Sequence, residues 1–318
     1  MSFEKVDVTE FTNAELQEAM SVASSQRISS FEDIAERVHH RIENPRSTSG
    51  FTLPWGKTVD LVRLREKELS LVAGLAGHRK TTLISQVLLW LSQQTKVGLA
   101  SFEMDLEDVA EIMIWQAAAS GSAPSKQFVN HFLDYTKGKI YGFDYRGTVA
   151  PLMALGIIRA MAEKGCKVIC LDSLMMCGIN NDLDAEREFV SALTGLARSL
   201  DVHVMLVHHA LEKKNDGEAQ IPQRQTIRGN GAIVDLCSTV FLVWLNKKKM
   251  EIMQKQENYP EPLEEKEAEY LETHCCQKLI VAKQRYHPFE GSINLWSHPS
   301  RQMLSHKGAN SVALDFGK

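Results

Sequence analysis

Long apolar runs are missing from this sequence. Residues 82–91 form the longest apolar stretch in a helical context, far short of the roughly 20 residues that cross a bilayer. The first ten residues, MSFEKVDVTE, are polar and acidic, which is not the pattern of a secretory signal. We therefore expect neither a membrane anchor nor secretion.

Cysteine is scarce and follows no regular framework. Six cysteines in 318 residues predict free thiols in a reducing cytoplasm rather than a disulfide scaffold. His274, Cys275 and Cys276 are adjacent, and on a strand their side chains would alternate between the two faces. A single tetrahedral metal site is therefore not expected there, and no zinc-ribbon spacing occurs elsewhere.

Strong net charge, internal repeats and low-complexity tracts are also absent. With a net charge of −4, any grip on nucleic acid has to come from a local patch of cations. A composition of 44% hydrophobic and 24% charged residues is typical of a globular protein. The length suits one large α/β domain with appendages.

The pattern divides the chain into two regions. Residues 1–59 are predicted to form an N-terminal extension, in which Ser30 caps a linker helix over 30–42 and ENPRSTSG then breaks the chain. Residues 60–318 are predicted to form the main domain. Within it, residues 246–274 are dense in charge and predict a solvated helical insertion between two strands, with partner docking as an alternative role.

Apolar runs alternate with helical patterns through the main domain. Runs of Val, Ile and Leu separated by amphipathic segments predict an α/β fold, a mostly parallel sheet with helices on both faces. A C-terminal β-hairpin is predicted at 278–284 and 291–296. The other predicted strands are 69–73, 97–102, 139–143, 167–172, 203–208 and 239–245, and the predicted helices are 80–94, 106–119, 150–164 and 185–200.

A strand, a glycine-rich loop and a helix are predicted for LSLVAGLAGHRKTTLISQVLLWL. The loop matches the phosphate-loop pattern G-x-x-x-x-G-K-[ST], except that Arg79 stands in place of the last glycine. In such loops backbone N–H groups hold phosphates, the lysine reaches the β- and γ-phosphates, and the hydroxyl binds Mg²⁺. The expected nucleotide contacts are Gly74, Gly77, Arg79, Lys80, Thr81 and Thr82.

Two interpretations of Arg79 stay open. Either the backbone there tolerates a side chain, whose cation then adds to the phosphate site, or nucleotide binding is weakened. A second match, Gly56-Lys57-Thr58, lacks the preceding strand and the earlier glycine, so we interpret it as a surface turn.

Two acidic residues and a histidine end predicted strands, at the edge where parallel α/β sheets bind ligands. Glu103 follows VGLASF and can polarise a water for attack on a γ-phosphate, or simply cap the next helix. Asp172 ends KVICLD, a Walker B pattern whose carboxylate holds Mg²⁺. His209 ends HVMLVHH, as a sensor of the γ-phosphate or a plain rim histidine.

These motifs in this order resemble the ring helicases of the DnaB, Twinkle and phage primase–helicase group, over roughly residues 60–305. ASFEM, CLDSLMM and LVHHALEKKN are similar to the family's second motif, Walker B motif and third motif. The resemblance implies a RecA-like P-loop NTPase core in which Glu103 is catalytic and His209 senses the γ-phosphate. QTIRGNGAIVDLCSTVFLVW is the most specific stretch, similar to the family's R-G-S-G-A-[IL] segment through Arg228, Gly229, Gly231 and Ala232.

The stretch LIVAKQRYHPFEGSINLW resembles the family's Lys-x-Arg hairpin. The resemblance implies that Lys283 and Arg285 reach the γ-phosphate of the neighbouring subunit. Gln284 lies between them, so both would point to one face of a strand. Without the other motifs, we would interpret Lys283 and Arg285 as a surface pair on an edge strand. Trp296, on the second hairpin strand, is a candidate contact for the nucleotide base, with core burial as the alternative.

A long polar stretch, residues 210–231, follows the predicted sensor strand. Long loops in compact domains are functional or disordered, and the resemblance places a DNA-binding loop here. It contains no aromatic residue, so we expect contact with the backbone of a single strand and little sequence preference. The residues expected to contact DNA, rather than only solvent, are Lys213, Lys214, Arg224 and Arg228.

Together these expectations describe a cytoplasmic NTP hydrolase that uses ATP or another NTP with Mg²⁺. It would act as a homohexameric ring helicase on single-stranded DNA in phage or mobile-element replication. No primase domain is recognised in the sequence, so a separate primase or other replisome protein is an expected partner. Two alternatives stay open: a hydrolysis-deficient clamp or loader, which Arg79 favours, and a RecA- or RadA-like recombination ATPase.

Overall fold

The computed structural model describes residues 17, 29–179, 182–211, 221–229, 231–259 and 262–316. Contacts divide the chain into two compact units, Met1–Arg46 and Ser47–Lys318. Residues 47–59, expected in the N-terminal extension, lie in the larger unit, where Leu53 and Trp55 are buried.

The smaller unit contains helix α2 (Ala35–Glu43), which has no buried residue. Its apolar side chains are in solvent, and Ile42 is 71% exposed. The helix begins later than predicted, because residues 31–34 form a turn in which the Ser30 hydroxyl accepts a bond from the Asp33 N–H at 3.1 Å.

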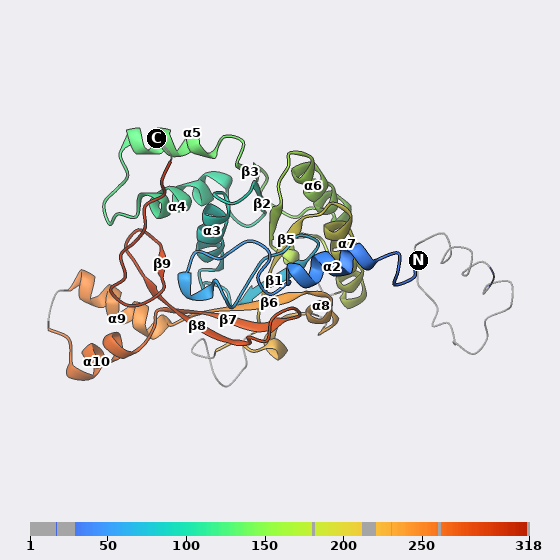
Figure 1. The fold of residues 1–318 in the computed structure, drawn as a ribbon. Coiled ribbons are helices and arrows are strands. Elements are labelled where there is room, and N and C mark those ends of the chain that lie inside the picture. Colours follow the sequence, from blue (N-terminus) through green and yellow to red (C-terminus); the bar gives the residue numbers. More distant parts are fainter. Residues whose placement is uncertain are drawn as a thin grey trace. The chain divides into compact units, whose positions relative to one another are not determined.

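A nine-stranded sheet organises the larger unit, in the order β3-β2-β4-β5-β1-β6-β7-β8-β9 (Figure 1). Neighbours from β3 to β6 pair in parallel, whereas β6-β7, β7-β8 and β8-β9 pair antiparallel. The predicted α/β class, with a mostly parallel sheet and a C-terminal hairpin, is therefore confirmed. The strands are β1 (Leu69–Gly74), β2 (Val97–Ser101), β3 (Ile140–Phe143), β4 (Val168–Asp172), β5 (His203–His209), β6 (Thr239–Leu245), β7 (Gln277–Gln284), β8 (Gly291–Ser297) and β9 (Met303–Leu304).

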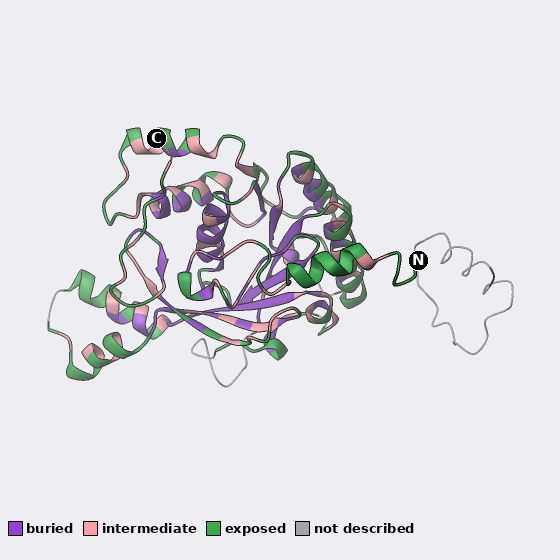
Figure 2. Ribbon diagram, viewed as in Figure 1, coloured by how far each residue is buried: buried purple, intermediate pink, exposed green. Residues whose placement is uncertain are grey.

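Helices cover both faces of this sheet, and an apolar cluster lies under each layer. Every residue of β1, β2, β4 and β6 is buried (Figure 2), which explains their unbroken apolar sequences. One layer is α3 (Lys80–Leu91), α4 (Leu106–Ala118) and α5 (Lys126–Thr136); the other is α6 (Pro151–Glu163), α7 (Leu183–Ser199) and α8 (Gly231–Leu236).

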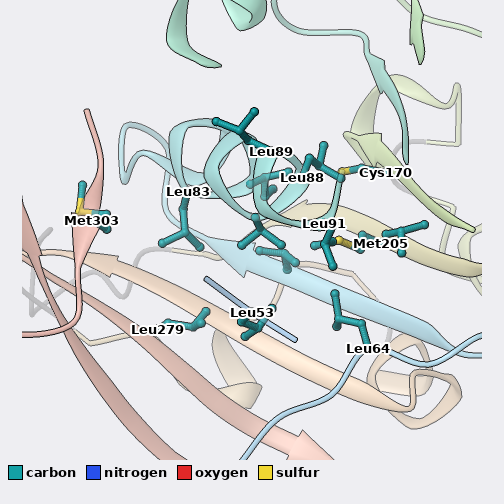
Figure 3. Packing of buried hydrophobic residues seen from close by; sticks show 14 of the residues in the cluster. Leu53, Leu64, Leu83, Leu88, Leu89, Leu91, Cys170, Met205, Leu279 and Met303 are labelled. Carbon is teal, nitrogen blue, oxygen red and sulfur yellow. The ribbon is translucent and has the colours of Figure 1, made fainter. Parts of the chain in front are cut away.

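Helix α3 is the best-anchored element of the first layer. Its leucines, among them Leu83, Leu88 and Leu91, pack onto the sheet beside Met205 of β5 (Figure 3). This buried packing fixes the helix that starts at the predicted phosphate loop, because close-packed side chains resist displacement.

The charged stretch 246–274 forms a helical hairpin between β6 and β7, as predicted. Its helices are α9 (Lys247–Asn258) and α10 (Glu265–Thr273), and α10 has no buried residue. Asn246 closes the neck of the hairpin: its backbone N–H donates to Cys276 O (2.9 Å) and its side-chain amide to Cys275 O (3.2 Å).

All six cysteines are buried free thiols. Among the described residues, no helix has the length and apolar character needed to span a membrane.

A buried histidine at the start of β5 ties stability to pH. His203 is fully buried; its Nδ1 lies 2.8 Å from Arg65 O and therefore carries the proton, while Nε2 accepts from the Ser70 hydroxyl at 2.9 Å. Burial lowers the pKa of His203 to about 4. An unfolded histidine titrates near 6.5, so stability held by the neutral ring is lost as the pH falls from about 6.5 to 4.

We expect His203→Asn to reduce this loss, because asparagine keeps a donor for Arg65 O but does not titrate. Between pH 7 and pH 5, wild type should lose about 2 kcal/mol more unfolding free energy than the variant. Urea unfolding at both pH values measures the difference. The buried His208, whose pKa burial also lowers to about 4, is present in both proteins and cancels. Equal losses would contradict the prediction.

Candidate nucleotide site

Four neighbouring strands, β2, β4, β5 and β1, end at one edge of the sheet. The predicted phosphate loop follows β1, Glu103 follows β2, Asp172 ends β4 and His209 ends β5. The sheet thus brings to one edge the four features that the sequence placed at strand ends, where parallel sheets bind ligands.

The loop between β1 and α3 has the geometry of a phosphate cradle. Gly74 needs to be glycine, because a Cβ there would lie 2.5 Å from Val243 O on β6, and Gly77 has a positive φ of +73°. The buried Lys80 folds back over the loop, and its Nζ donates to Gly74 O and Leu75 O at 3.0 Å each. Burial lowers the pKa of Lys80, and the charges of Asp172 and Glu103 oppose that shift. A bound phosphate can replace these carbonyls as the lysine's partner.

Arg79 occupies a glycine-like conformation. It is the N-cap of α3, with φ 57° and ψ 35° in the left-handed region. Its side chain makes no cap bond to the helix. The backbone of the loop therefore has the conformation that a glycine would adopt. Because arginine has a Cβ, holding it in this left-handed conformation costs free energy that a glycine would not cost.

Arg79→Gly is expected to raise the free energy of unfolding by about 0.5–1 kcal/mol. Relief of a left-handed conformation, about 1–2 kcal/mol, exceeds the extra chain entropy of glycine, about 0.5–1 kcal/mol. Urea unfolding measures the change. Arg79→Ala is the matched control, since it also removes the cation but keeps a Cβ. If both variants gain equally, the charge and not the backbone is the source of the effect.

Thr81, at the start of α3, and Asp172, at the end of β4, together suit the binding of a magnesium ion. The Thr81 hydroxyl donates to Asp172 Oδ2 at 2.8 Å, and Asp172 is 2% exposed. Burial raises the pKa of Asp172 to about 6, and the nearby charge of Glu103 adds to the shift. A buried anion of this kind is stabilised by a cation, and Mg²⁺ prefers a few protein oxygens together with phosphate and water. Among the described residues there is no cluster of three or more metal-binding side chains.

Glu103 is held between two donors. His209 Nε2 lies 3.2 Å from Glu103 Oε1, and the Ser173 hydroxyl donates to the same oxygen. The bond from His209 lowers the pKa of Glu103 to about 2, assisted by Ser173 and against the effect of burial. The carboxylate is therefore ionised at neutral pH, and its contact with His209 connects the ends of β2 and β5.

Lys283 and Arg285 lie away from this edge. They face the end of α8, where Lys283 Nζ donates to Val234 O (2.7 Å) and Asp235 O (3.1 Å), and Arg285 donates to Asp235 O. Gln284, between them, bonds Leu61 O on the opposite side at 2.9 Å. The pKa of Lys283 is lowered, first by burial and then by the charge of Arg285.

The register of β7 separates this pair from the nucleotide edge of its own sheet. Gln277 pairs with Leu245 at the end of β6, and Lys283 pairs with Val240 near its start. Six residues of strand correspond to about 20 Å. The two cations are therefore too far along the strand to reach a phosphate bound at Lys80 of the same chain.

The residues expected to bind DNA fall into two groups. Lys213 and Lys214 lie outside the described residues. Arg228 is joined to the sensor strand: its N–H donates to His209 O (3.0 Å), and its carbonyl accepts from His208 Nε2 (2.7 Å). The Arg224 guanidinium contacts the β7-β8 hairpin, through Ala282 O and Glu290. Their contacts with DNA remain predictions.

The remaining predicted contacts lie near the C-terminal strands or at the start of α3. Trp296 is half-buried on β8, with Lys57 Nζ 5.3 Å from the ring centroid. Lys57, from the second Gly-Lys-Thr match, belongs to a 3-10 helix and donates to Asn294 O and Ser305 O, so that segment is a structural turn. Thr82 O accepts from Gln116 Nε2 at 2.9 Å. No nucleotide contact of Trp296 is established.

The sequence did not indicate that the phosphate loop is bonded to the ends of β6 and β7 that flank the charged hairpin. His78, fully buried in the loop, accepts at Nδ1 from the Leu245 N–H (3.1 Å), and its carbonyl accepts from Gln277 Nε2 (3.0 Å). Lys247 Nζ lies 4.0 Å from the position that a Cβ on Gly77 would take. Glu290 was also missed, because nothing local marks it as the partner of a residue 66 positions away.

The sheet order and the placement of the phosphate loop, Asp172 and Glu103 define a RecA-like α/β core, the fold of P-loop NTPases. A family model described as an AAA domain matches residues 59–215. No curated protein sequence matches the chain.

Solved structures share this fold, and two of them cover most of the chain. One, titled as an "ATPase Domain", is 17% identical with a TM-score of 0.67, over 88% of this chain and 100% of that chain. A structure titled "The Structure Of A DnaB-Like Replicative Helicase And Its Interactions With Primase" is 16% identical with a TM-score of 0.65, over 91% of this chain and 70% of that chain. The resemblance to DnaB-type motor domains predicted from the motifs is confirmed at the level of the fold.

Proposed function

We propose that this chain is the motor subunit of a ring-shaped DNA helicase, which hydrolyses ATP and moves along single-stranded DNA. The observation that carries the proposal is the distance between the two halves of the reaction machinery. Lys80, Thr81, Asp172 and Glu103 gather at one edge of the sheet, while Arg285 lies about 20 Å away along a strand. Such a separation suits a site completed by the next subunit of a closed ring.

The chain's own residues have distinct roles in this proposal. Lys80 leaves its loop carbonyls and binds the β- and γ-phosphates, and the N–H groups at the start of α3 hold the phosphate oxygens. Thr81 and Asp172 hold Mg²⁺, which neutralises charge between the phosphates when bound. Lys283 and Arg285 of one subunit reach the γ-phosphate held by the next.

In this proposal, the contact between Glu103 and His209 couples ATP hydrolysis to movement of the DNA-binding loop. As long as His209 donates to Glu103, the carboxylate is a weak base, because that bond lowers its pKa to about 2. A γ-phosphate that draws the His209 N–H to itself frees Glu103 to orient and deprotonate water. The same shift moves Arg228, which is bonded to His209 O, and with it the DNA-binding loop.

Contacts with partners follow from this arrangement. Lys213, Lys214 and Arg228 track the phosphates of the strand inside a six-membered ring, and Trp296 packs near the base. The exposed apolar side of α2 (Ala35–Glu43) packs on a neighbouring subunit as the linker helix. Replication of a phage or mobile element in the host cytoplasm is the setting we favour, with priming done by a separate primase.

Steady-state ATP hydrolysis with and without poly(dT) tests the proposal. We expect turnover to rise at least about tenfold with DNA, together with hexameric rings by native mass spectrometry in the presence of a non-hydrolysable ATP analogue. ATP binding without turnover would reject the motor in favour of a clamp or loader. Filaments on DNA instead of rings would favour a recombination ATPase. Arg79 gives the clamp little support, since its backbone keeps the conformation of a glycine.

A further inference from the structure

Residues 221–229, here called the root segment, are a described part of the polar stretch 210–231. An antiparallel bridge pairs Ile227 with Ala210, and the Leu211 N–H donates to Thr226 O at 2.6 Å. Arg228 is bonded in both directions to the end of β5. The root segment therefore moves together with the sensor strand.

The other end of the root segment holds the hairpin of β7 and β8. Arg224 Nε donates to Ala282 O, and its Nη2 lies 2.5 Å from Glu290 Oε2. Ala282 immediately precedes Lys283, and Glu290 immediately precedes β8. One guanidinium thus joins both strands of the hairpin, directly beside the two cations.

Helix α8, which follows the root segment in the chain, supports the same cations. The carbonyls at its end accept bonds from Lys283 and Arg285. The Lys283 ammonium also senses the charge of Arg224, which contributes to its lowered pKa. Residues on both sides of position 230 therefore contact the hairpin, so a displacement of this part of the chain displaces the hairpin as well.

Stability alone does not account for the Arg224–Glu290 pair. Its side chains are 42% and 47% exposed, and an exposed pair of this kind contributes about 0.2–1 kcal/mol. The pair contributes little energy but imposes a defined geometry, because a planar guanidinium binds a carbonyl and a carboxylate in fixed directions. Such fixed directions allow a displacement of Arg224 to be transmitted to the β7-β8 hairpin.

We propose that Arg224 and Glu290 are positioning residues that couple the sensor strand of one subunit to the trans-acting cations it presents to the next. A change at His209 moves Arg228, the root segment and Arg224, and the hairpin then shifts Lys283 and Arg285 relative to the neighbour's phosphate. This inference rests on the proposed ring motor. It gives Arg224 a role within the protein in place of a contact with DNA phosphates.

The test compares wild type, Glu290→Gln and the charge exchange Arg224→Glu/Glu290→Arg. For each protein, kcat is measured with and without saturating poly(dT), and DNA affinity is measured by fluorescence anisotropy at one salt concentration. Glu290→Gln should keep its DNA-free turnover and its DNA affinity but lose at least about fivefold of the DNA stimulation. The charge exchange rebuilds the ion pair but not the bond to Ala282 O, so it should restore part of the stimulation, although it removes the cation from position 224.

The possible outcomes separate this inference from the proposed function. A wild type without DNA stimulation rejects the motor, and the coupling with it. A stimulated wild type with an equally stimulated Glu290→Gln rejects the coupling and leaves the motor intact. Weakened DNA binding by the charge exchange, with no recovery of stimulation, would make Arg224 a DNA contact and also reject the coupling.

Discussion

Glutamine in place of Glu103 is expected to lower kcat for ATP hydrolysis by about 100- to 10 000-fold, with ATP affinity unchanged. The amide oxygen can still accept bonds from Ser173 and His209, so the local structure should persist. It can no longer take a proton from the attacking water. Single-turnover hydrolysis and fluorescent-nucleotide titration, run on the same preparation, measure the two quantities.

Glu107→Gln provides the control for that experiment. Glu107 is an exposed residue in the first turn of α4, so the substitution is chemically identical and leaves the site untouched. It should have wild-type kcat. If Glu103→Gln also keeps more than about a tenth of the wild-type rate, a residue other than Glu103 is the base.

Arg285→Ala is expected to reduce kcat by about 10³-fold, since a guanidinium on the transferring phosphoryl group is worth roughly 10³–10⁵ in rate. The reduction should appear in assembled rings, with nucleotide affinity and thermal stability close to wild type. Its bond to Asp235 O is on an exposed surface and contributes little to folding. Steady-state hydrolysis at protein concentrations above ring assembly measures the effect.

Mixing the two inactive variants tests whether Arg285 acts in trans. In a random 1:1 ring, about one interface in four joins an intact Glu103 from the Arg285→Ala subunit to an intact Arg285 from the Glu103→Gln subunit. Activity should therefore return to about a quarter of wild type when interfaces act independently. If Arg285 served its own nucleotide, every mixture would stay as inactive as its components.

The candidate nucleotide site at the edge of the sheet was predictable from sequence because its signals are local. Continuous apolar runs identify buried parallel strands, and the residues that follow them lie at one edge whatever the detailed packing. Glu103, Asp172 and His209 were located in this way, without knowledge of a single long-range contact. The conformation of Arg79 was not predictable in this way: the sequence left open whether the backbone there tolerates a side chain, and only the folded loop has the left-handed φ of 57°.

Long-range partners could not be predicted from the sequence. Arg224 has the composition and neighbourhood of a DNA contact, and only the folded chain brings Ala282 and Glu290 to its guanidinium. Helix α5 was not predicted, because it is short and most of its residues are exposed. Ser125 caps it, with a hydroxyl that accepts from the Phe128 N–H. Strand β9 has two residues, too few for any periodic pattern.

The neck at Asn246 has a consequence for how this protein can be modified. Asn246, Cys275 and Cys276 close the base of the α9-α10 hairpin, and no residue of α10 is buried. A reporter dye attached to an exposed side chain of α10 would therefore leave the pairing of β6 with β7 in place. At the base of the same hairpin, the last residue of β6 and the first residue of β7 are both bonded to His78 in the phosphate loop, so a change in that loop would reach the dye through the base of the hairpin.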